Sequence, residues 1–235
     1  HGKYNLCEKL KVMGFQTTGT ASEFFAVDAS KVTPIPAEMS FEEGAMIEPL
    51  AVAVHGVKQM GDVAGMNIAV IGAGPIGNLV AQTAKGMGAA KVMITDVSTL
   101  RLEKAKECGV DVCVNTKDVD FGEAMLDAFG PDKADVIYDC AGNNVTMGQA
   151  IKYARKGSVI VLVAVFAGMA EVDLAVANDH ELDIKSTMMY RHDDYVDGIR
   201  LVNEGKVHLK PLISKTFAFK DYLKAYQYID DNRET

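Results

Sequence analysis

The stretch IAVIGAGPIGNLVAQ, residues 68–82, constrains the fold more than any other part of the chain. In it, a β-branched run leads into an apolar helical pattern through residues 72–77, which fit G-x-G-x-x-G. Glycines also mark ordinary turns, so the motif alone is a weak signal. Here it follows a predicted strand and opens a predicted helix, which is the context in which such a turn binds the phosphates of a dinucleotide.

Each residue of this turn has its own expected role. Gly72 would allow the tight turn, Gly74 would let the backbone approach a pyrophosphate, and Gly77 would let the helix pack closely on the strand. Pro75 and Ile76 would begin the helix, whose free N–H groups face the phosphates. The turn therefore predicts a dinucleotide-binding site.

The segment around the turn alternates regularly between strands and helices. Short apolar or β-branched runs predict six strands, at residues 67–72, 91–96, 110–115, 134–140, 158–165 and 182–189. Apolar periodicity predicts helices between them, one ending near residue 87 and others at 99–108, 122–129 and 145–154. This alternation indicates an α/β fold with a doubly wound parallel Rossmann sheet.

The second predicted strand ends at Asp96, nineteen residues after Gly77. A carboxylate at this place accepts hydrogen bonds from the adenosine ribose diol and repels a 2′-phosphate. No Lys or Arg follows immediately, so the sequence predicts NAD rather than NADP as the cofactor. Asp96 also weakens the alternative of a strand–turn–helix unit without a ligand. Arg101 is expected either to lie over the adenosine or to be an ordinary solvated helix residue.

Two later strand ends complete the predicted cleft. Cys140 and Ala141 end the fourth strand, where they would line the dinucleotide site, and Val163 and Ala164 end the fifth, where they would flank the nicotinamide.

The flanks of this segment do not continue the alternation of strands and helices. Residues 1–39 lack helical periodicity, and residues 21–36 predict a strand, a turn and a second strand. Ser40 and Glu43 form a capping-box pattern that starts a helix near Phe41. Further predictions follow residue 190: a helix at 193–206, a strand at 212–217 and a helix at 220–231. We expect the two flanks to pack together as part of another domain, with divisions at 1–50, 51–189 and 190–235.

Composition excludes several classes of partner. The net charge of −8 argues against a nucleic-acid surface and against an anionic membrane. No apolar run is long enough to span a bilayer, and the first residues are too polar for a signal peptide. Four widely spaced cysteines indicate buried thiols in a reducing compartment. We therefore expect a cytoplasmic protein with no nucleic-acid or membrane partner.

Four stretches together carry a family resemblance. They are GKYNLC (2–7), SFEEGAMIEPLAVAVHG (40–56), the glycine turn, and LVNEGKVHLKPLISKTFAFKDYLKAY (201–226). They resemble the zinc-dependent medium-chain alcohol dehydrogenases, most closely the sorbitol (polyol) dehydrogenase branch. "EPL" is typical of the polyol and threonine branches.

The resemblance implies NAD-dependent and zinc-dependent oxidation of a secondary alcohol of a polyol to a ketose. It also implies a GroES-like, β-rich catalytic domain with a catalytic and a structural zinc, and a homodimer or homotetramer joined through the open edge of the sheet at 182–189. In the family, a Cys and a neighbouring His-Glu pair that hold the catalytic zinc precede the cofactor domain. No such segment occurs here, so the chain is interpreted as a fragment of a longer enzyme.

Three residues take roles from this resemblance. It places Glu48 beside the catalytic zinc, as a ligand or as a partner of the zinc-bound water; the alternative is a carboxylate paired with a nearby arginine. It makes Cys7 the fourth cysteine of the structural-zinc loop. Arg191 would reach toward substrate hydroxyls, or else form a surface ion pair with Asp193 or Asp194.

Other residues point to ordinary packing. Cys108, Cys113 and Cys140 are expected to be small buried residues, and His55 and Phe15 to be core residues, although Phe15 could also line a substrate pocket. Three rival functions remain open: a non-catalytic NAD-binding module, a threonine or small-diol dehydrogenase of the same family, and a zinc-free reductase.

Overall fold

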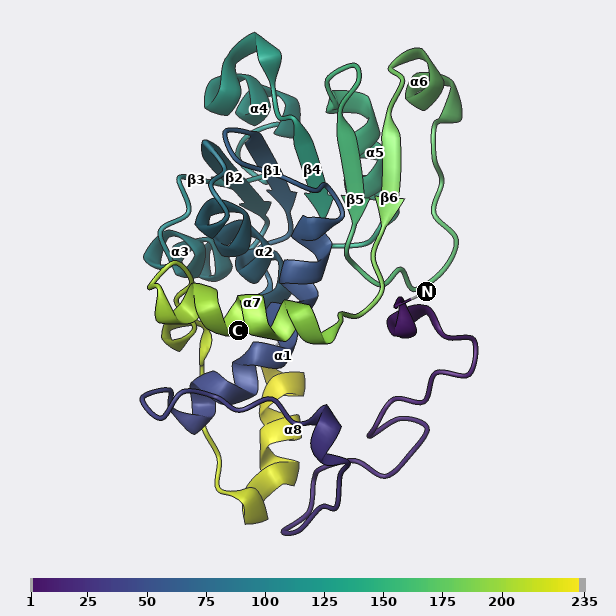
Figure 1. Ribbon diagram of the computed structural model, residues 1–235. Helices are drawn as coiled ribbons and strands as arrows, with labels where there is room; N and C mark the ends of the chain where they lie inside the picture. Colours follow the sequence, from purple (N-terminus) through teal and green to yellow (C-terminus); the bar gives the residue numbers. More distant parts are fainter. Residues whose placement is uncertain (1, 233–235) are drawn as a thin grey trace.

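The computed structural model describes residues 2–232, and its centre is one parallel six-stranded sheet (Figure 1). The strand order is β3-β2-β1-β4-β5-β6, which confirms the predicted doubly wound α/β fold. The strands are β1 (Asn67–Ile71), β2 (Lys91–Asp96), β3 (Val112–Asn115), β4 (Val136–Asp139), β5 (Val159–Leu162) and β6 (Asp183–Ser186).

Helices cover both faces of the sheet, because successive side chains of a strand point to opposite faces. Ile68 and Val70 of β1 pack into one core cluster with residues of α1, α2 and α3, whereas Ala69 and Ile71 pack into another with residues of α4 and α5. The α-helices are α1 (Phe41–Lys58), α2 (Pro75–Gly86), α3 (Thr99–Glu107), α4 (Phe121–Phe129), α5 (Asn144–Tyr153), α6 (Leu174–Asp179), α7 (His192–Asn203) and α8 (Tyr222–Asp231).

Helix starts follow the predicted capping chemistry. The Ser40 hydroxyl accepts a hydrogen bond from the Glu43 N–H at 3.2 Å, and the Glu43 carboxylate accepts one from the Ser40 N–H at 3.2 Å. This capping box opens α1 where it was expected. Ser98 likewise caps α3, and Gly109, with φ +82°, follows the end of that helix. The predicted boundary between residues 50 and 51 lies inside α1.

Two predicted β segments are wrong. Residues 21–36 are irregular except for the short 3-10 helix η2 (Ala29–Lys31), and residues 212–217 are irregular after the 3-10 helix η4 (Lys210–Leu212). A strand needs a neighbouring strand to pair its backbone N–H and C=O groups. All strands of the described sheet come from residues 67–186, so neither segment has a neighbour to pair with.

The N-terminal flank contacts the beginning of α7. The Tyr4 hydroxyl accepts a hydrogen bond from the His192 N–H, and Thr33 Oγ1 lies 3.3 Å from His192 Nδ1. Phe15, however, is 85% exposed, so the prediction that it is a core residue is wrong. Within residues 2–232, no helix combines the length and apolarity needed to cross a membrane.

Candidate functional site

The glycine turn lies at the point where the strand order reverses. β1 lies between β2 and β4, and the chain builds outward from β1 in one direction and from β4 in the other. Ligands of open α/β sheets bind in the crevice at this point. A Cβ added to Gly72 would lie 3.2 Å from both the Cβ and the N of Ala141, so the turn after β1 and the loop after β4 meet there.

The three glycines have the backbone geometry that a phosphate-binding turn requires. Gly72 has φ +98°, a conformation that favours glycine. A Cβ on Gly77 would lie 1.8 Å from the Gly72 carbonyl oxygen, so only glycine fits where α2 approaches β1. A Cβ on Gly74 would meet nothing within 4 Å, and no side chain caps α2 there. The N-terminus of α2, which begins with Pro75 and Ile76, thus faces open space.

Asp96 holds this turn in place. Its Oδ2 accepts a hydrogen bond from the Ala73 N–H at 2.7 Å, and its Oδ1 accepts from Val97 N at 2.7 Å and from Ser98 N at 2.8 Å. The side chain is 7% exposed, and Arg101 Nη1 lies 4.0 Å away. The sequence suggested a ribose contact for Asp96 but gave no sign of this structural role.

A cavity of about 250 Å³ adjoins the turn. One wall consists of Ala73–Pro75 and of Leu100, Arg101 and Lys104 from α3; the other consists of residues 211–214 and Tyr228. Arg101 thus lines a cavity on the Asp96 side of the turn, where the adenosine of a dinucleotide is expected. The sequence did not predict that residues 211–214 form a wall of this cavity, because no sequence pattern links them to the glycine turn at residues 72–77.

The loops after β4 and β5 meet on the other side of the turn. A Cβ on Gly142 would lie 2.7 Å from the Ala164 Cβ, so the structure brings Cys140 and Ala141 next to Val163 and Ala164. Burial raises the pKa of the Cys140 thiol far above its usual range, and the charge of Asp139 adds to this effect. A thiol in this state is not a nucleophile.

The other cysteines form no site. Burial raises the pKa of Cys108 and of Cys113 to about 11. Cys108 is buried as predicted, whereas Cys113 is only half-buried against the core. Cys7 is an exposed free thiol.

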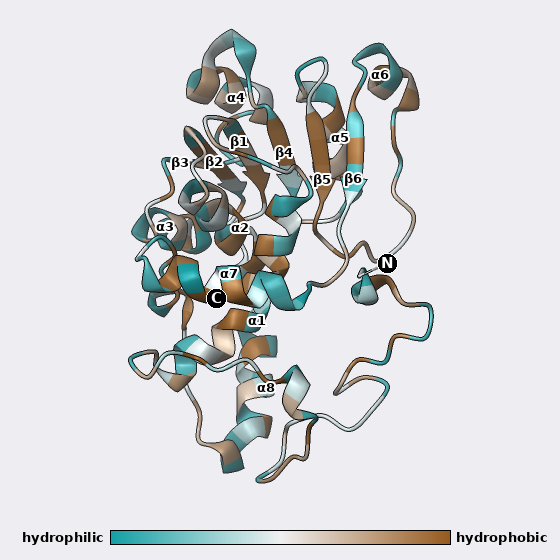
Figure 2. Cartoon of the chain, in the orientation of Figure 1, coloured by the Kyte–Doolittle hydropathy of each residue, from teal (hydrophilic) through white to brown (hydrophobic). Residues whose placement is uncertain are grey.

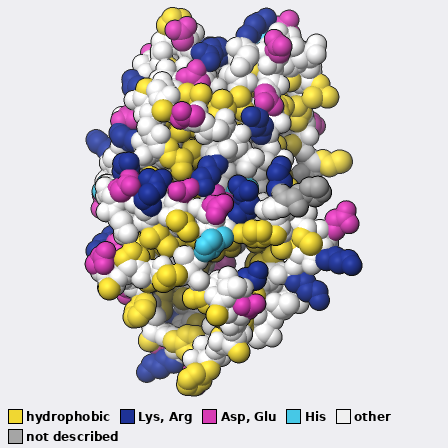
Figure 3. Space-filling view, in the orientation of Figure 1, with side chains coloured by type: hydrophobic (Ala, Val, Ile, Leu, Met, Phe, Trp, Pro, Cys, Tyr) yellow, Lys and Arg dark blue, Asp and Glu magenta, His cyan; other side chains and the backbone are white. Residues whose placement is uncertain are grey.

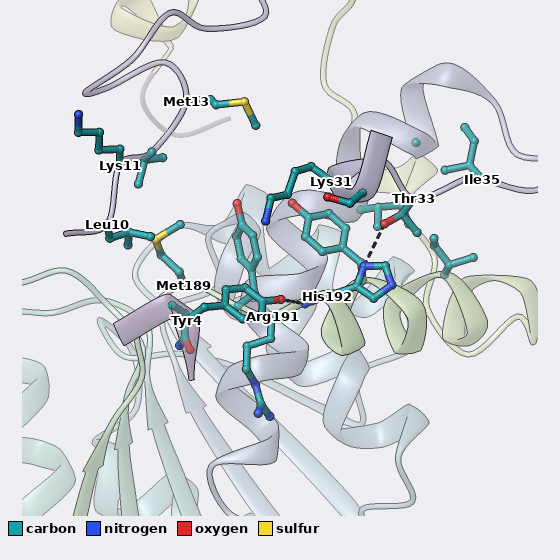
Figure 4. Close-up of a pocket in the computed structure, with 18 residues that line it drawn as sticks. Tyr4, Leu10, Lys11, Met13, Lys31, Thr33, Ile35, Met189, Arg191 and His192 are labelled. Carbon is teal, nitrogen blue, oxygen red and sulfur yellow. Dashed lines mark hydrogen bonds between the residues drawn. The ribbon is translucent and has the colours of Figure 1, made fainter. Parts of the chain in front are cut away.

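A second cavity, of about 690 Å³, separates the N-terminal flank from α1 and the start of α7 (Figure 4). Its walls are largely apolar, with aliphatic and aromatic side chains, and they also carry the basic residues Lys11, Lys31, Arg191 and His192. The Arg191 side chain extends away from Lys11 and Lys31 in Figure 4. Among the described residues it forms no ion pair with Asp193 or Asp194, and its buried Nε has no hydrogen-bond partner. The expected role of Arg191 toward a substrate stays a prediction.

Glu48 is exposed on α1 and lies beside Tyr190 rather than beside an arginine. Burial raises the pKa of Tyr190, and the neighbouring Glu48 carboxylate raises it further. In the part of the chain that the structure describes, no three His, Cys, Asp or Glu side chains converge to hold a metal ion. Glu48 and Cys7 could therefore each contribute only a single ligand, and their zinc roles stay predictions.

Asp194 fixes the chain at Arg191, just before α7, beside this cavity. It is fully buried, and its carboxylate accepts hydrogen bonds from His55 Nδ1 at 2.8 Å, Lys58 Nζ at 2.9 Å and the Arg191 N–H at 2.8 Å. Asn5 adds a bond to the Met188 carbonyl at 2.9 Å. His55 is thus a buried structural residue, as predicted, but the sequence gave no sign of its partner.

This arrangement can be compared with known proteins. The model of a family described as zinc-binding dehydrogenase matches residues 75–204, more than half of the chain. The chain belongs to the zinc-binding dehydrogenase family. The resemblance drawn from the sequence is therefore confirmed.

Individual relatives of this zinc-binding dehydrogenase chain are also dehydrogenases. It is 33% identical to Sorbitol dehydrogenase 1 of Saccharomyces cerevisiae, over 97% of this chain and 66% of that protein. It is similar in structure to 2R,3R-butanediol dehydrogenase from Bacillus subtilis (TM-score 0.91, 29% identity, 100% of this chain and 67% of that one). It is also similar to a short chain alcohol dehydrogenase (rspB) from Escherichia coli CFT073 complexed with NADH (TM-score 0.89, 30% identity, 97% and 67%). The chain spans slightly less than two thirds of the yeast enzyme.

Proposed function

We propose that this chain binds NAD and forms the cofactor-binding part of a zinc-dependent dehydrogenase. The observation that carries the proposal is the glycine turn at the strand reversal, with Gly74 open to the crevice, an uncapped α2 and Asp96 beside it. Helix N-termini and free backbone N–H groups bind phosphates. The NADH complex of the Escherichia coli neighbour supports the same ligand.

The proposed reaction is oxidation of a secondary alcohol of a polyol, of the sorbitol or xylitol kind, to a ketose. The similarity to yeast sorbitol dehydrogenase supports it. Zinc in such an enzyme polarises the alcohol oxygen. Residues 2–232 bring no three metal ligands together, so the proposal assigns no reaction step to a zinc ion held by these residues alone.

The residues of this chain would act by binding and orienting. The N-terminus of α2 would hold the pyrophosphate, Asp96 would meet the adenosine ribose, and the loops after β4 and β5 would hold the nicotinamide. Glu48, oriented by Tyr190, would contribute to the zinc site, and Arg191 would face the substrate.

Calorimetric titration of the chain with NAD and with NADP tests this proposal. We expect NAD to bind at least about tenfold more tightly than NADP, because Asp96 repels a 2′-phosphate. Asp96→Asn should narrow this preference because it removes the charge; it keeps one of the two acceptor oxygens, whereas Asp96→Ala would remove all three hydrogen bonds. Asp62→Asn is a matched control, since Asp62 accepts the Ala64 N–H at 2.9 Å outside the crevice. Absence of binding to either nucleotide would contradict the proposal.

Two alternatives have specific support. The similarity to butanediol dehydrogenase supports a small diol as the substrate, with a threonine-like amino alcohol as a variant of it. The lack of a three-ligand metal group within residues 2–232 supports a non-catalytic NAD-binding module. Activity measured with zinc-loaded protein on sorbitol, 2,3-butanediol and threonine would separate these functions.

We also propose a homodimer or homotetramer in the cytoplasm. β6 is the edge strand of the sheet, and exposed apolar residues of the nearby segment, Val165 and Met169, support its covering by a second subunit. The four free thiols are compatible with a reducing compartment. A monomeric mass by light scattering would contradict the oligomer.

A further inference from the structure

Asp139 joins the two loops on the β4–β5 side of the crevice. It ends β4, and its side chain is fully buried. Its Oδ1 accepts hydrogen bonds from the N–H groups of Ala141 and Gly142, both at 3.0 Å. Its carbonyl oxygen accepts from Val163 N at 2.9 Å and Ala164 N at 3.0 Å. One residue thus fixes the loop after β4 through its side chain and the loop after β5 through its backbone.

The carboxylate of Asp139 differs from the other fully buried carboxylate of the described chain. Asp194 is paired with the Lys58 ammonium and with His55. Every donor that reaches Asp139 within residues 2–232 is electrically neutral: two backbone N–H groups and the Thr146 hydroxyl at 3.2 Å. A buried charge without a cation is costly, so its presence at this place calls for a function.

The position of Asp139 relative to a bound dinucleotide follows from the turn. With the pyrophosphate at residues 72–77 and the adenosine toward Asp96 at the end of β2, the other half of the ligand extends toward β4 and β5. That half carries the nicotinamide ring. The ring is positively charged in the oxidised cofactor and neutral in the reduced one, so a nearby buried negative charge distinguishes the two forms.

We propose that Asp139 is a positioning residue that also makes the crevice favour the oxidised over the reduced nicotinamide. It acts through its field and through the two loops, without touching the cofactor. The inference rests on the proposed binding of NAD. In a dehydrogenase that oxidises an alcohol, such a residue would favour binding of the reactant form of the cofactor and release of the product form.

The test compares dissociation constants of the chain for NAD, NADH and ADP-ribose with those of Asp139→Asn. The asparagine Oδ1 can still accept from Ala141 and Gly142, and its amide can donate to the Thr146 hydroxyl, which itself donates to the Asn143 carbonyl. We expect the ratio of the NAD constant to the NADH constant to rise about three- to tenfold, while ADP-ribose, which has no nicotinamide, changes less than about twofold. An equal weakening of all three ligands, or no change in the ratio, would overturn the proposal.

Asp120→Asn is the matched control. Asp120 accepts hydrogen bonds from two backbone N–H groups and one hydroxyl, from Gly122, Glu123 and Tyr153, but it is exposed and lines neither cavity. This variant should leave the ratio unchanged.

A measurement without a mutation covers the case in which Asp139→Asn does not fold. The chain should bind NAD several-fold more tightly than benzamide adenine dinucleotide, a neutral analogue of the same shape. Equal affinity would overturn the inference. Failure of the chain to bind ADP-ribose at all would instead refute the proposed dinucleotide site, and this inference with it.

Discussion

The sheet region and the flanking region use apolar residues in opposite ways (Figures 2 and 3). In the sheet region, β1, β2 and β4 are almost entirely buried between two layers of helices. In the flanks, Phe15, Phe24 and Phe41 are 85–91% exposed, and α8 has no buried residue although it is amphipathic. An apolar pattern therefore shows which residues need another surface to pack against. In the sheet region, the helices of the same chain provide that surface.

The largest expected effect compares two phenylalanines. Phe121 is fully buried in the core between α4, α5 and the sheet, whereas Phe41 is 89% exposed at the start of α1. We expect Phe121→Ala to lower the free energy of unfolding by about 3–5 kcal/mol, because it leaves a cavity. Phe41→Ala should change it by less than about 0.5 kcal/mol. Urea denaturation followed by circular dichroism measures both; equal costs would mean that the flank is as well packed as the sheet.

A second prediction sharpens the comparison within the sheet region. Gly77→Ala would place a Cβ against the Gly72 carbonyl, so we expect a loss of about 2–3 kcal/mol from overpacking, together with loss of NAD binding. Gly148→Ala in α5 is its control, because a Cβ there meets nothing within 4 Å and alanine favours a helix. A Gly77→Ala protein as stable as the native chain would show that α2 does not need this close approach to β1.

The smallest expected effect lies at the junction of the two regions, where α1 meets α7. Burial alone would raise the pKa of Asp197, but hydrogen bonds and charges from Lys58 and Arg200 lower it overall. A lowered pKa in the folded state stabilises the fold above the unfolded value, 3.8, and this contribution is lost as the pH falls through the folded value.

Asp197→Asn should therefore cost less than about 1 kcal/mol at pH 7, since the pair is partly exposed, and progressively less as the pH falls below 3.8 through the lowered folded value. Thermal melts of both proteins between pH 7 and pH 2.5 check this. Curves that stay parallel across that range would contradict the assignment.

The local features of the fold could be predicted from the sequence. The glycine turn, the Ser40–Glu43 cap and β2 at 91–96 lie where expected, because each depends on residues close together in the chain. The strand predicted at 212–217 failed, because its β-branched pattern says nothing about whether another strand is available for pairing.

The candidate site likewise has residues that could be predicted from the sequence and surroundings that could not. Gly72, Gly74 and Gly77 could be located from their spacing together with the strand before them and the helix after them, and so could the position of Asp96 at a strand end. Their surroundings could not: the wall formed by residues 211–214, the placement of Tyr190 beside Glu48 and the pairing of His55 with Asp194 join segments far apart in sequence.

The sequence by itself thus determined the α/β class, the order of the strands in the sheet region and the position of the glycine turn, since periodicity, caps and glycine geometry act over a few residues. Only the tertiary structure decided what surrounds each carboxylate. Asp96 holds the turn, Asp194 is paired with a lysine, and Asp139 is buried among neutral donors. Identical side chains differ here because burial and neighbouring charge are set by the segments that meet in space.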